Sequence, residues 1–136
     1  MKTVMSGLDL RAIASELSQM VGSHCKKCYQ PHYEQVVLRL RAKSGGNTDV
    51  VLVRGKRIYT SQRDRPMPLY PPPFAMVLRK SLTNSRLKAV EQIGFDRVLR
   101  FVFENSHGIF HLYVEVFRDG NIILTDGDDV IIQPLT

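Results

Sequence analysis

The sequence has no tryptophan, two cysteines among its 136 residues, and no long hydrophobic run. Its longest apolar stretches, such as residues 50–53 and 122–124, have the length of β-strands and fall far short of the roughly 20 residues that a membrane-spanning helix needs. Two cysteines are too few for the disulfide framework of a small secreted domain. The first residues lack the apolar core and the cleavage site of a signal peptide. We therefore expect a cytoplasmic protein.

Positive charge outweighs negative charge and is spread unevenly. Nineteen Lys and Arg against thirteen Asp and Glu give a net charge of +6. Residues 1–100 hold eighteen basic and seven acidic residues, a net charge of +11, whereas residues 101–136 hold one and six, a net charge of −5. This asymmetry indicates an electropositive surface suited to a polyanion. A basic surface without a specific partner is an equally good explanation of charge taken alone.

The two cysteines form the motif CKKC at residues 25–28. A structural zinc site normally needs a second pair of ligands, and the nearby His24 and His32 lack the spacing of known zinc fingers. A disulfide is disfavoured in a cytoplasmic chain. On a regular strand, residues three apart point to opposite faces. We therefore interpret the cysteines as ordinary half-buried thiols and expect neither a metal nor a cofactor.

Two helices are indicated. Ser6 followed by Asp9 matches a capping box, apolar residues then recur near helical spacing, and Gly22 ends the run. A second helix is predicted over residues 74–82, directly after the proline-rich stretch 62–73. We interpret that stretch as a rigid connector, with a PxxP ligand for a partner domain as the alternative.

Alternating apolar residues and short glycine turns predict β-strands elsewhere in the chain. The predicted strands cover residues 24–29, 33–41, 49–53, 57–60, 87–93, 98–104, 109–117, 121–125 and 130–133. The predicted fold class is α+β: one domain over residues 1–136, with a mostly antiparallel β-sheet of about eight strands and two helices.

Four blocks of sequence carry a resemblance to a known family. They are MSGLDLRA at residues 5–12, FAMVLRK at 74–80, GFDRV at 94–98 and EVFRDGNIILTD at 115–126. Together and in this order they resemble the NFACT-N domain, the amino-terminal domain of the NEMF and RqcH ribosome quality-control proteins. Bacterial and archaeal members of this family are often labelled fibronectin-binding protein A-like.

The resemblance implies a module that binds tRNA and a large ribosomal subunit obstructed by a peptidyl-tRNA. In many lineages such proteins support template-free addition of residues to the carboxyl end of the stalled chain. The functional residues that carry over are Asp9 and the pair Asp96-Arg97. The resemblance also implies a fold like the N-terminal domain of formamidopyrimidine-DNA glycosylases. Those enzymes use a proline and a glutamate directly after the initiator methionine, where this chain has Lys2 and Thr3, so we expect no enzyme activity.

The sequence departs from its relatives in two respects. Ser81 stands where many of them have a histidine, so a contact from that histidine is not expected here. Full-length members continue into a helix-hairpin-helix segment, a coiled coil and a further RNA-binding domain. We therefore expect this chain to be a fragment of a longer multidomain protein.

The proposed site residues also have structural explanations. Asp9 completes the capping box, and its carboxylate can equally accept from a nucleotide 2′-OH or amine. Arg97 can bind phosphate bidentately with Asp96 fixing its orientation, while a turn aspartate beside a surface arginine is the alternative. Further predicted contacts to the RNA backbone come from basic residues that would individually be solvated charges. These residues are Arg54, Lys56, Arg57, Arg79, Lys80, Arg86 and Lys88.

Four aromatic residues are candidates for stacking on unpaired bases, with packing as the alternative: Tyr29, Tyr33, Tyr59 and Phe74. The expected partners are tRNA and the large ribosomal subunit, with no membrane and no small-molecule substrate. Two other functions stay open. One is a nucleic-acid-processing enzyme related to the glycosylases, and the other is a surface adhesin.

Overall fold

The computed structural model describes residues 5–62, 71–94 and 97–136. Within these residues the chain forms two helices, α1 (Gly7–Ser18) and α2 (Pro73–Leu82), and neither is long and apolar enough to span a membrane. It also forms nine strands: β1 (His24–His32), β2 (Gln35–Arg41), β3 (Asn47–Val53), β4 (Arg57–Ser61), β5 (Arg86–Gln92), β6 (Val98–Asn105), β7 (Gly108–Glu115), β8 (Ile122–Asp126) and β9 (Ile131–Pro134). The predicted fold class is confirmed. Most of the proline-rich stretch, and Asp96, lie outside the described residues.

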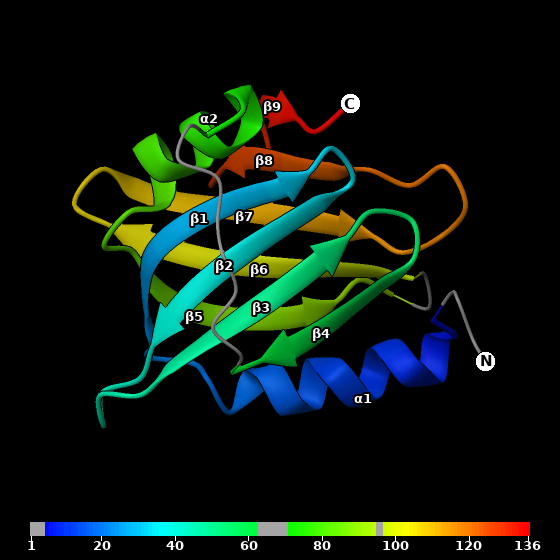
Figure 1. Ribbon diagram of the computed structural model, residues 1–136, viewed down its shortest axis with the longest axis horizontal. Helices are drawn as coiled ribbons and strands as arrows, with labels where there is room; N and C mark the ends of the chain where they lie inside the picture. The colour runs from blue at the N-terminus through cyan, green and yellow to red at the C-terminus, as the bar shows by residue number, and fades with distance from the viewer. Residues whose placement is uncertain (1–4, 63–70, 95–96) are drawn as a thin grey trace.

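All nine strands belong to one antiparallel sheet, in the order β4-β3-β2-β1-β5-β6-β7-β8-β9. Neighbouring strands pair over several residues, except that β1 and β5 share the single pair His24–Arg86. The sheet bends at this junction, which we call the seam. As a result β1–β4 form a front layer and β5–β9 a back layer (Figure 1). α1 runs along one open side against β4 and β5, and α2 covers the other side against β1.

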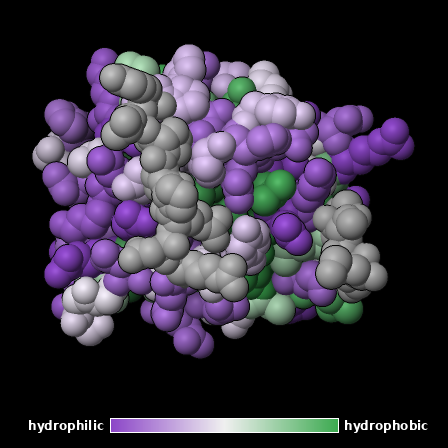
Figure 2. Space-filling view, in the orientation of Figure 1, coloured by the Kyte–Doolittle hydropathy of each residue, from purple (hydrophilic) through white to green (hydrophobic). Residues whose placement is uncertain are grey.

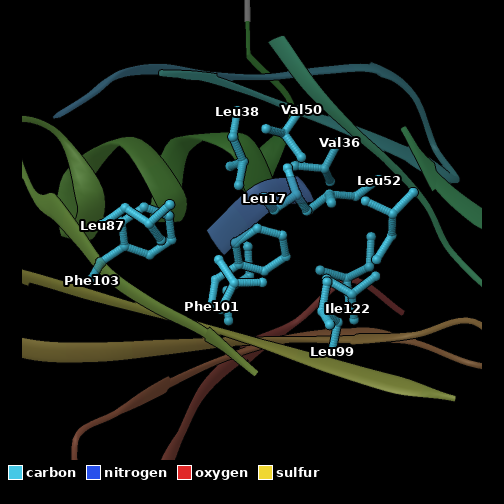
Figure 3. Packing of buried hydrophobic residues seen from close by; sticks show 14 of the residues in the cluster. Leu17, Val36, Leu38, Val50, Leu52, Leu87, Leu99, Phe101, Phe103 and Ile122 are labelled. Carbon is cyan, nitrogen blue, oxygen red and sulfur yellow. The ribbon is translucent and has the colours of Figure 1, made fainter. Parts of the chain in front are cut away.

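Aliphatic and phenylalanine side chains fill the space between the two layers (Figure 3). Leu38 and Val50 reach into it from the front layer, and Phe101 and Phe103 from β6, all four with no exposed surface. The two phenylalanines lie two residues apart on one strand, so both point inward, with ring centroids 6.3 Å apart. Removing one such buried side chain typically costs about 2–5 kcal/mol. This core is the rigid framework that positions the surface residues.

The predicted capping box is present at the start of α1. The Asp9 amide donates to Ser6 Oγ at 3.1 Å, and the Ser6 amide donates to Asp9 Oδ2 at 3.0 Å. These bonds satisfy two donors that a helix start leaves open. The helix itself ends at Ser18 and not at Gly22, because turn hydrogen bonds replace the helical ones over the next residues. Gly22, with φ of +98°, instead donates to the carbonyl oxygen of Leu87 and joins α1 to β5.

The interpretation of the two cysteines as half-buried thiols on opposite faces is wrong. A β-bulge between Cys25 and Lys27 adds a residue to β1, so that Cys25 pairs with Leu40 and Cys28 with Leu38. Both thiols therefore point into the core with no exposed surface, and their sulfur atoms lie 3.7 Å apart. The hydrogen bond with Cys25, followed by burial, raises the pKa of the Cys28 thiol well above its usual value. The pair is a neutral part of the core.

Candidate nucleic-acid interface

Segments that are far apart in the sequence meet at the start of α1. The amide of Met5 donates to the carbonyl oxygen of Lys56, in the turn between β3 and β4, at 2.8 Å. Arg97, which directly precedes β6, donates from Nη1 to the carbonyl oxygen of Met5 at 3.4 Å. Asp9 lies in the first turn of the helix, bound to Ser6. The predicted residues Asp9, Lys56 and Arg97 therefore gather at one end of the molecule, on the right in Figure 1.

The β3–β4 turn brings a fourth predicted residue to this end. Arg54 donates from Nη1 to the carbonyl oxygen of Gly120 at 2.8 Å, so the turn is held against the loop that precedes β8. Gly55 has φ of +71°, and a Cβ there would lie 3.1 Å from the carbonyl oxygen of Phe117, which explains the glycine. The four predicted residues at this end define what we call the α1-start site: Asp9, Arg54, Lys56 and Arg97.

Arg97 is half-buried and presents open donors. Among the described residues its guanidinium has one hydrogen-bond acceptor, the Met5 carbonyl oxygen. A guanidinium carries five N–H groups, so most of them are available to another acceptor, and phosphate can accept two in parallel. The contact with Met5 restricts the orientation of the side chain. Asp96, predicted to orient Arg97, is outside the described residues.

The α1-start site is only weakly electropositive. Its three cations share this end of the molecule with the carboxylates of Asp9 and Glu34, and Glu34 Oε2 lies 3.7 Å from Lys56 Nζ. Lys56 is more than half exposed, so this ion pair contributes little to stability. Anion binding here would depend on directed hydrogen bonds from arginine more than on net charge.

An open hollow of about 470 Å³ adjoins the site, lined by Gly7, Leu8, Arg11, Gln92 and Gly94. Leu8 is 78% exposed, which is unusual for a leucine at the start of a helix. Helical spacing groups Leu8 with Ile13 and Leu17, but the buried i, i+3, i+4, i+7 stripe begins at Leu10 and leaves Leu8 outside it. An exposed leucine beside a cation can contact the apolar face of a base or sugar while the cation meets the phosphate.

Arg79 belongs to a different part of the surface. It reaches from α2 to β1, where its Nε donates to the carbonyl oxygen of Cys28 at 2.7 Å and its guanidinium carbon lies 5.3 Å from the centre of the Tyr29 ring. Arg39 lies on the same ring, at 5.1 Å, and forms a bidentate ion pair with Asp49 at 2.9 and 3.0 Å. Arg79 is therefore tied to the fold of β1.

The other predicted cations point in several directions. Lys80 lines a hollow between α2 and the β6–β7 turn, and Lys88 Nζ lies 3.9 Å from Glu104 on β6. Arg57 is exposed on β4, and Arg86 is exposed at the seam. The predicted cations therefore fall into separate groups on the surface.

Two of the four aromatic candidates cannot stack on a base. Phe74 is 3% exposed and Tyr29 is 9% exposed, because both pack against other residues. Tyr33 is 69% exposed and stays a candidate, whereas Tyr59 is half-buried with the guanidinium carbon of Arg57 5.3 Å from its ring centre.

A polar network on the back layer has a structural role. Tyr113 OH donates to Asp129 Oδ1 at 2.6 Å, and His111 Nδ1 lies 2.8 Å from the same oxygen. The hydrogen bond from Tyr113, then that from His111, lowers the pKa of the Asp129 carboxyl, while burial raises the pKa of Tyr113. Asp129 has φ of +63°, so the network fixes a turn in the left-handed region. Within residues 5–62, 71–94 and 97–136 no three His, Cys, Asp or Glu side chains gather as a metal site would require.

Comparison with known proteins identifies the relatives of the chain. A sequence model described as "NFACT N-terminal and middle domains" matches residues 6–136. The chain is 37% identical over 140 residues to the archaeal Rqc2 homolog aRqcH of Methanocaldococcus jannaschii, covering 99% of this chain and 21% of that protein. It is 35% identical over 136 residues to the human ribosome quality control complex subunit NEMF, covering 99% of this chain and 12% of that protein. The chain thus corresponds to a minor part of each relative.

The fold has a solved counterpart. The N-terminal part of the fibronectin/fibrinogen-binding protein of Streptococcus suis superimposes with a TM-score of 0.86 at 28% identity, covering 96% of this chain and 52% of that one. The expected likeness to glycosylases stays a prediction. The chain belongs to the NFACT family, and the relatives named above include ribosome quality control proteins.

Proposed function

We propose that the chain is the tRNA- and large-subunit-binding module of a ribosome quality control factor. In this proposal the full protein recognises a large subunit obstructed by peptidyl-tRNA and helps to recruit tRNA for template-free tailing, in the cytoplasm. The family and the names of the relatives support the setting. The observation that carries the RNA contact is the gathering of Asp9 and Arg97 at one end of the domain, with guanidinium donors open.

Each residue of the α1-start site has a chemical role in this proposal. Arg97 binds a phosphate with two parallel hydrogen bonds, and Arg54 and Lys56 add contacts to the neighbouring backbone. Asp9 is placed to accept from a 2′-OH or an exocyclic amine. Contacts of this kind position RNA without reading its sequence, so the module binds tRNA broadly. No step requires the chain to make or break a covalent bond, so the role is a non-catalytic one.

The test is the affinity of the chain for bulk tRNA at several salt concentrations, alongside co-sedimentation with large ribosomal subunits. Arg97→Ala is expected to weaken tRNA binding about tenfold and to reduce the salt slope by about one phosphate contact, because one bidentate contact is lost. Arg100→Ala is the matched control, because it removes the same charge from a side chain that is bound to Glu91 on the back layer. Thermal melts of both variants separate binding from folding.

Two results would contradict the proposal. Wild-type binding that does not respond to salt would rule out a phosphate contact. Equal losses for Arg97→Ala and Arg100→Ala would show that only total charge matters. Cleavage of a damaged DNA duplex, or capture by fibronectin with no affinity for tRNA, would favour the glycosylase-like enzyme or the adhesin instead.

A further inference from the structure

The seam carries an outward row of basic side chains. Arg41 of β2, His24 of β1 and Arg86 of β5 are direct partners across three adjacent strands. Their chain neighbours Leu40, Cys25 and Leu87 are fully buried in the core, so the row itself points outward. Directly opposite residues on neighbouring strands have Cβ atoms about 5 Å apart.

A fourth basic residue joins this row. Lys43, in the turn after β2, is exposed, and its Cε lies 3.7 Å from the position that a Cβ would take on Gly22. Gly22 is itself bonded to Leu87 in β5, next to Arg86. We call the four residues the seam surface: His24, Arg41, Lys43 and Arg86.

Among the described residues, four cations elsewhere on the surface are paired with a carboxylate, whereas those of the seam surface are not. Arg39, Lys56, Lys88 and Arg100 each lie within 4 Å of an Asp or Glu oxygen. In the part of the chain that the structure describes, none of Arg41, Lys43 and Arg86 has such a partner. Glu104 stands opposite Arg86 on β6, but its carboxylate is 3.9 Å from Lys88. The charges lie about 10 Å apart across the row, beyond the Debye length of roughly 8 Å at physiological salt, so their mutual repulsion is largely screened and each can bind its own phosphate.

The chemistry of the seam surface favours a phosphate backbone over a protein partner. Protein interfaces have an apolar core. Among the residues that the structure describes, Val21, 46% exposed, is the one large exposed apolar residue close to the seam in sequence. The left side of Figure 2, where β2 ends and β5 begins, is mostly hydrophilic. Arginine donors and a histidine beside them match closely spaced anionic oxygens.

The seam surface is also separate from the α1-start site. α1 starts at the α1-start site and leads, through Gly22, to the seam, and its twelve residues span about 18 Å. The length of β2 gives a similar separation. Glu34, just before β2, accepts from the amide of Arg54 through its carbonyl oxygen, and Arg41, the last residue of β2, lies about 20 Å further along the strand. The two surfaces lie at opposite ends of the molecule.

We propose that the seam surface is a second RNA-binding surface, which holds a stretch of phosphate backbone that the α1-start site does not reach. The inference rests on the proposed function and deepens it: the domain grips RNA at two places about 20 Å apart. The α1-start site contributes directed hydrogen bonds, and the seam surface adds a separate share of the salt-dependent attraction.

The experiment measures the salt slope of tRNA binding for the full chain and for charge-neutralised variants. Arg41→Gln with Arg86→Gln is expected to reduce the slope by about 1.8, since each phosphate contact contributes roughly 0.9. Arg97→Ala added to this pair is expected to reduce the slope by a further 0.9 or so, because the surfaces are independent. Lys43→Gln alone changes an exposed side chain in a turn, so this variant is expected to fold like the wild type. Arg100→Gln, paired with Glu91, is the control and should leave the slope near that of wild type.

The outcomes separate the two proposals. If the Arg41/Arg86 and Lys43 variants match the Arg100→Gln control while Arg97→Ala still weakens binding, the seam surface is overturned and the proposed function stands. If the wild-type chain shows no salt-dependent tRNA binding, both fall. If the seam variants lose affinity for vesicles of phosphatidylserine and phosphatidylcholine but keep the RNA slope, the surface recognises membranes and the inference is wrong.

Discussion

At the scale of single residues, local signals could be read from the sequence and tertiary partners could not. The spacing of Ser6 and Asp9 predicts a capping box because both partners lie within one helical turn, and both hydrogen bonds are present. The contact between Arg97 and the Met5 carbonyl joins residues 92 positions apart, and no local pattern encodes it. The family resemblance selected Arg97, and the fold explains why it lies beside Asp9.

Asp9 has a structural role that can be measured apart from RNA binding. Asp9→Ala removes the bond to the Ser6 amide and a negative charge from the positive end of the helix, so we expect a loss of about 1 kcal/mol and a Tm lower by roughly 4 °C. Leu8→Ala, at a side chain that is 78% exposed, should leave the Tm unchanged. Differential scanning calorimetry of both variants checks this. An unchanged Tm for Asp9→Ala would mean that the capping box does not stabilise α1.

At the scale of elements, the strands could be predicted well and their irregularities could not. Alternation and glycine turns predict every strand of the sheet to within a few residues at each end. The bulge in β1 leaves no trace in residue type, because it depends on pairing with β2, and this is why the cysteines were assigned to opposite faces. The turn before β8 is a second feature that depends on tertiary packing, because the backbone around Gly120 leaves no room for a side chain.

Gly120 is expected to be intolerant of any side chain. A Cβ at this position would lie 2.7 Å from the carbonyl oxygen of Phe117 and closer still to that of Glu115, both of them backbone atoms that cannot move aside alone. Gly120→Ala should therefore cost about 2–3 kcal/mol and displace the carbonyl that holds Arg54. Gly46→Ala, with no atom within 4 Å of its Cβ, is the control. Urea denaturation of both variants measures the difference, and equal midpoints would contradict the packing argument.

At the scale of the whole molecule, net charge indicated a polyanion as partner but not where it binds. The basic excess of residues 1–100 indicates an electropositive surface but does not locate it. The sheet order places β1 beside β5, which brings Arg41 and Arg86 together, while carboxylates neutralise other cations such as Arg39 and Lys56. Both effects come from strand pairing between distant segments, so composition could not separate the α1-start site from the seam.

The central claim is that RNA backbone contacts Arg97 at the α1-start site, and NMR of the isotope-labelled chain during a tRNA titration tests it most directly. The side-chain Nε–Hε signal of Arg97 is predicted to shift and broaden with added tRNA, whereas that of Arg100, held by Glu91, stays in place. An Arg97 signal that remains unchanged while tRNA saturates the chain would contradict the account.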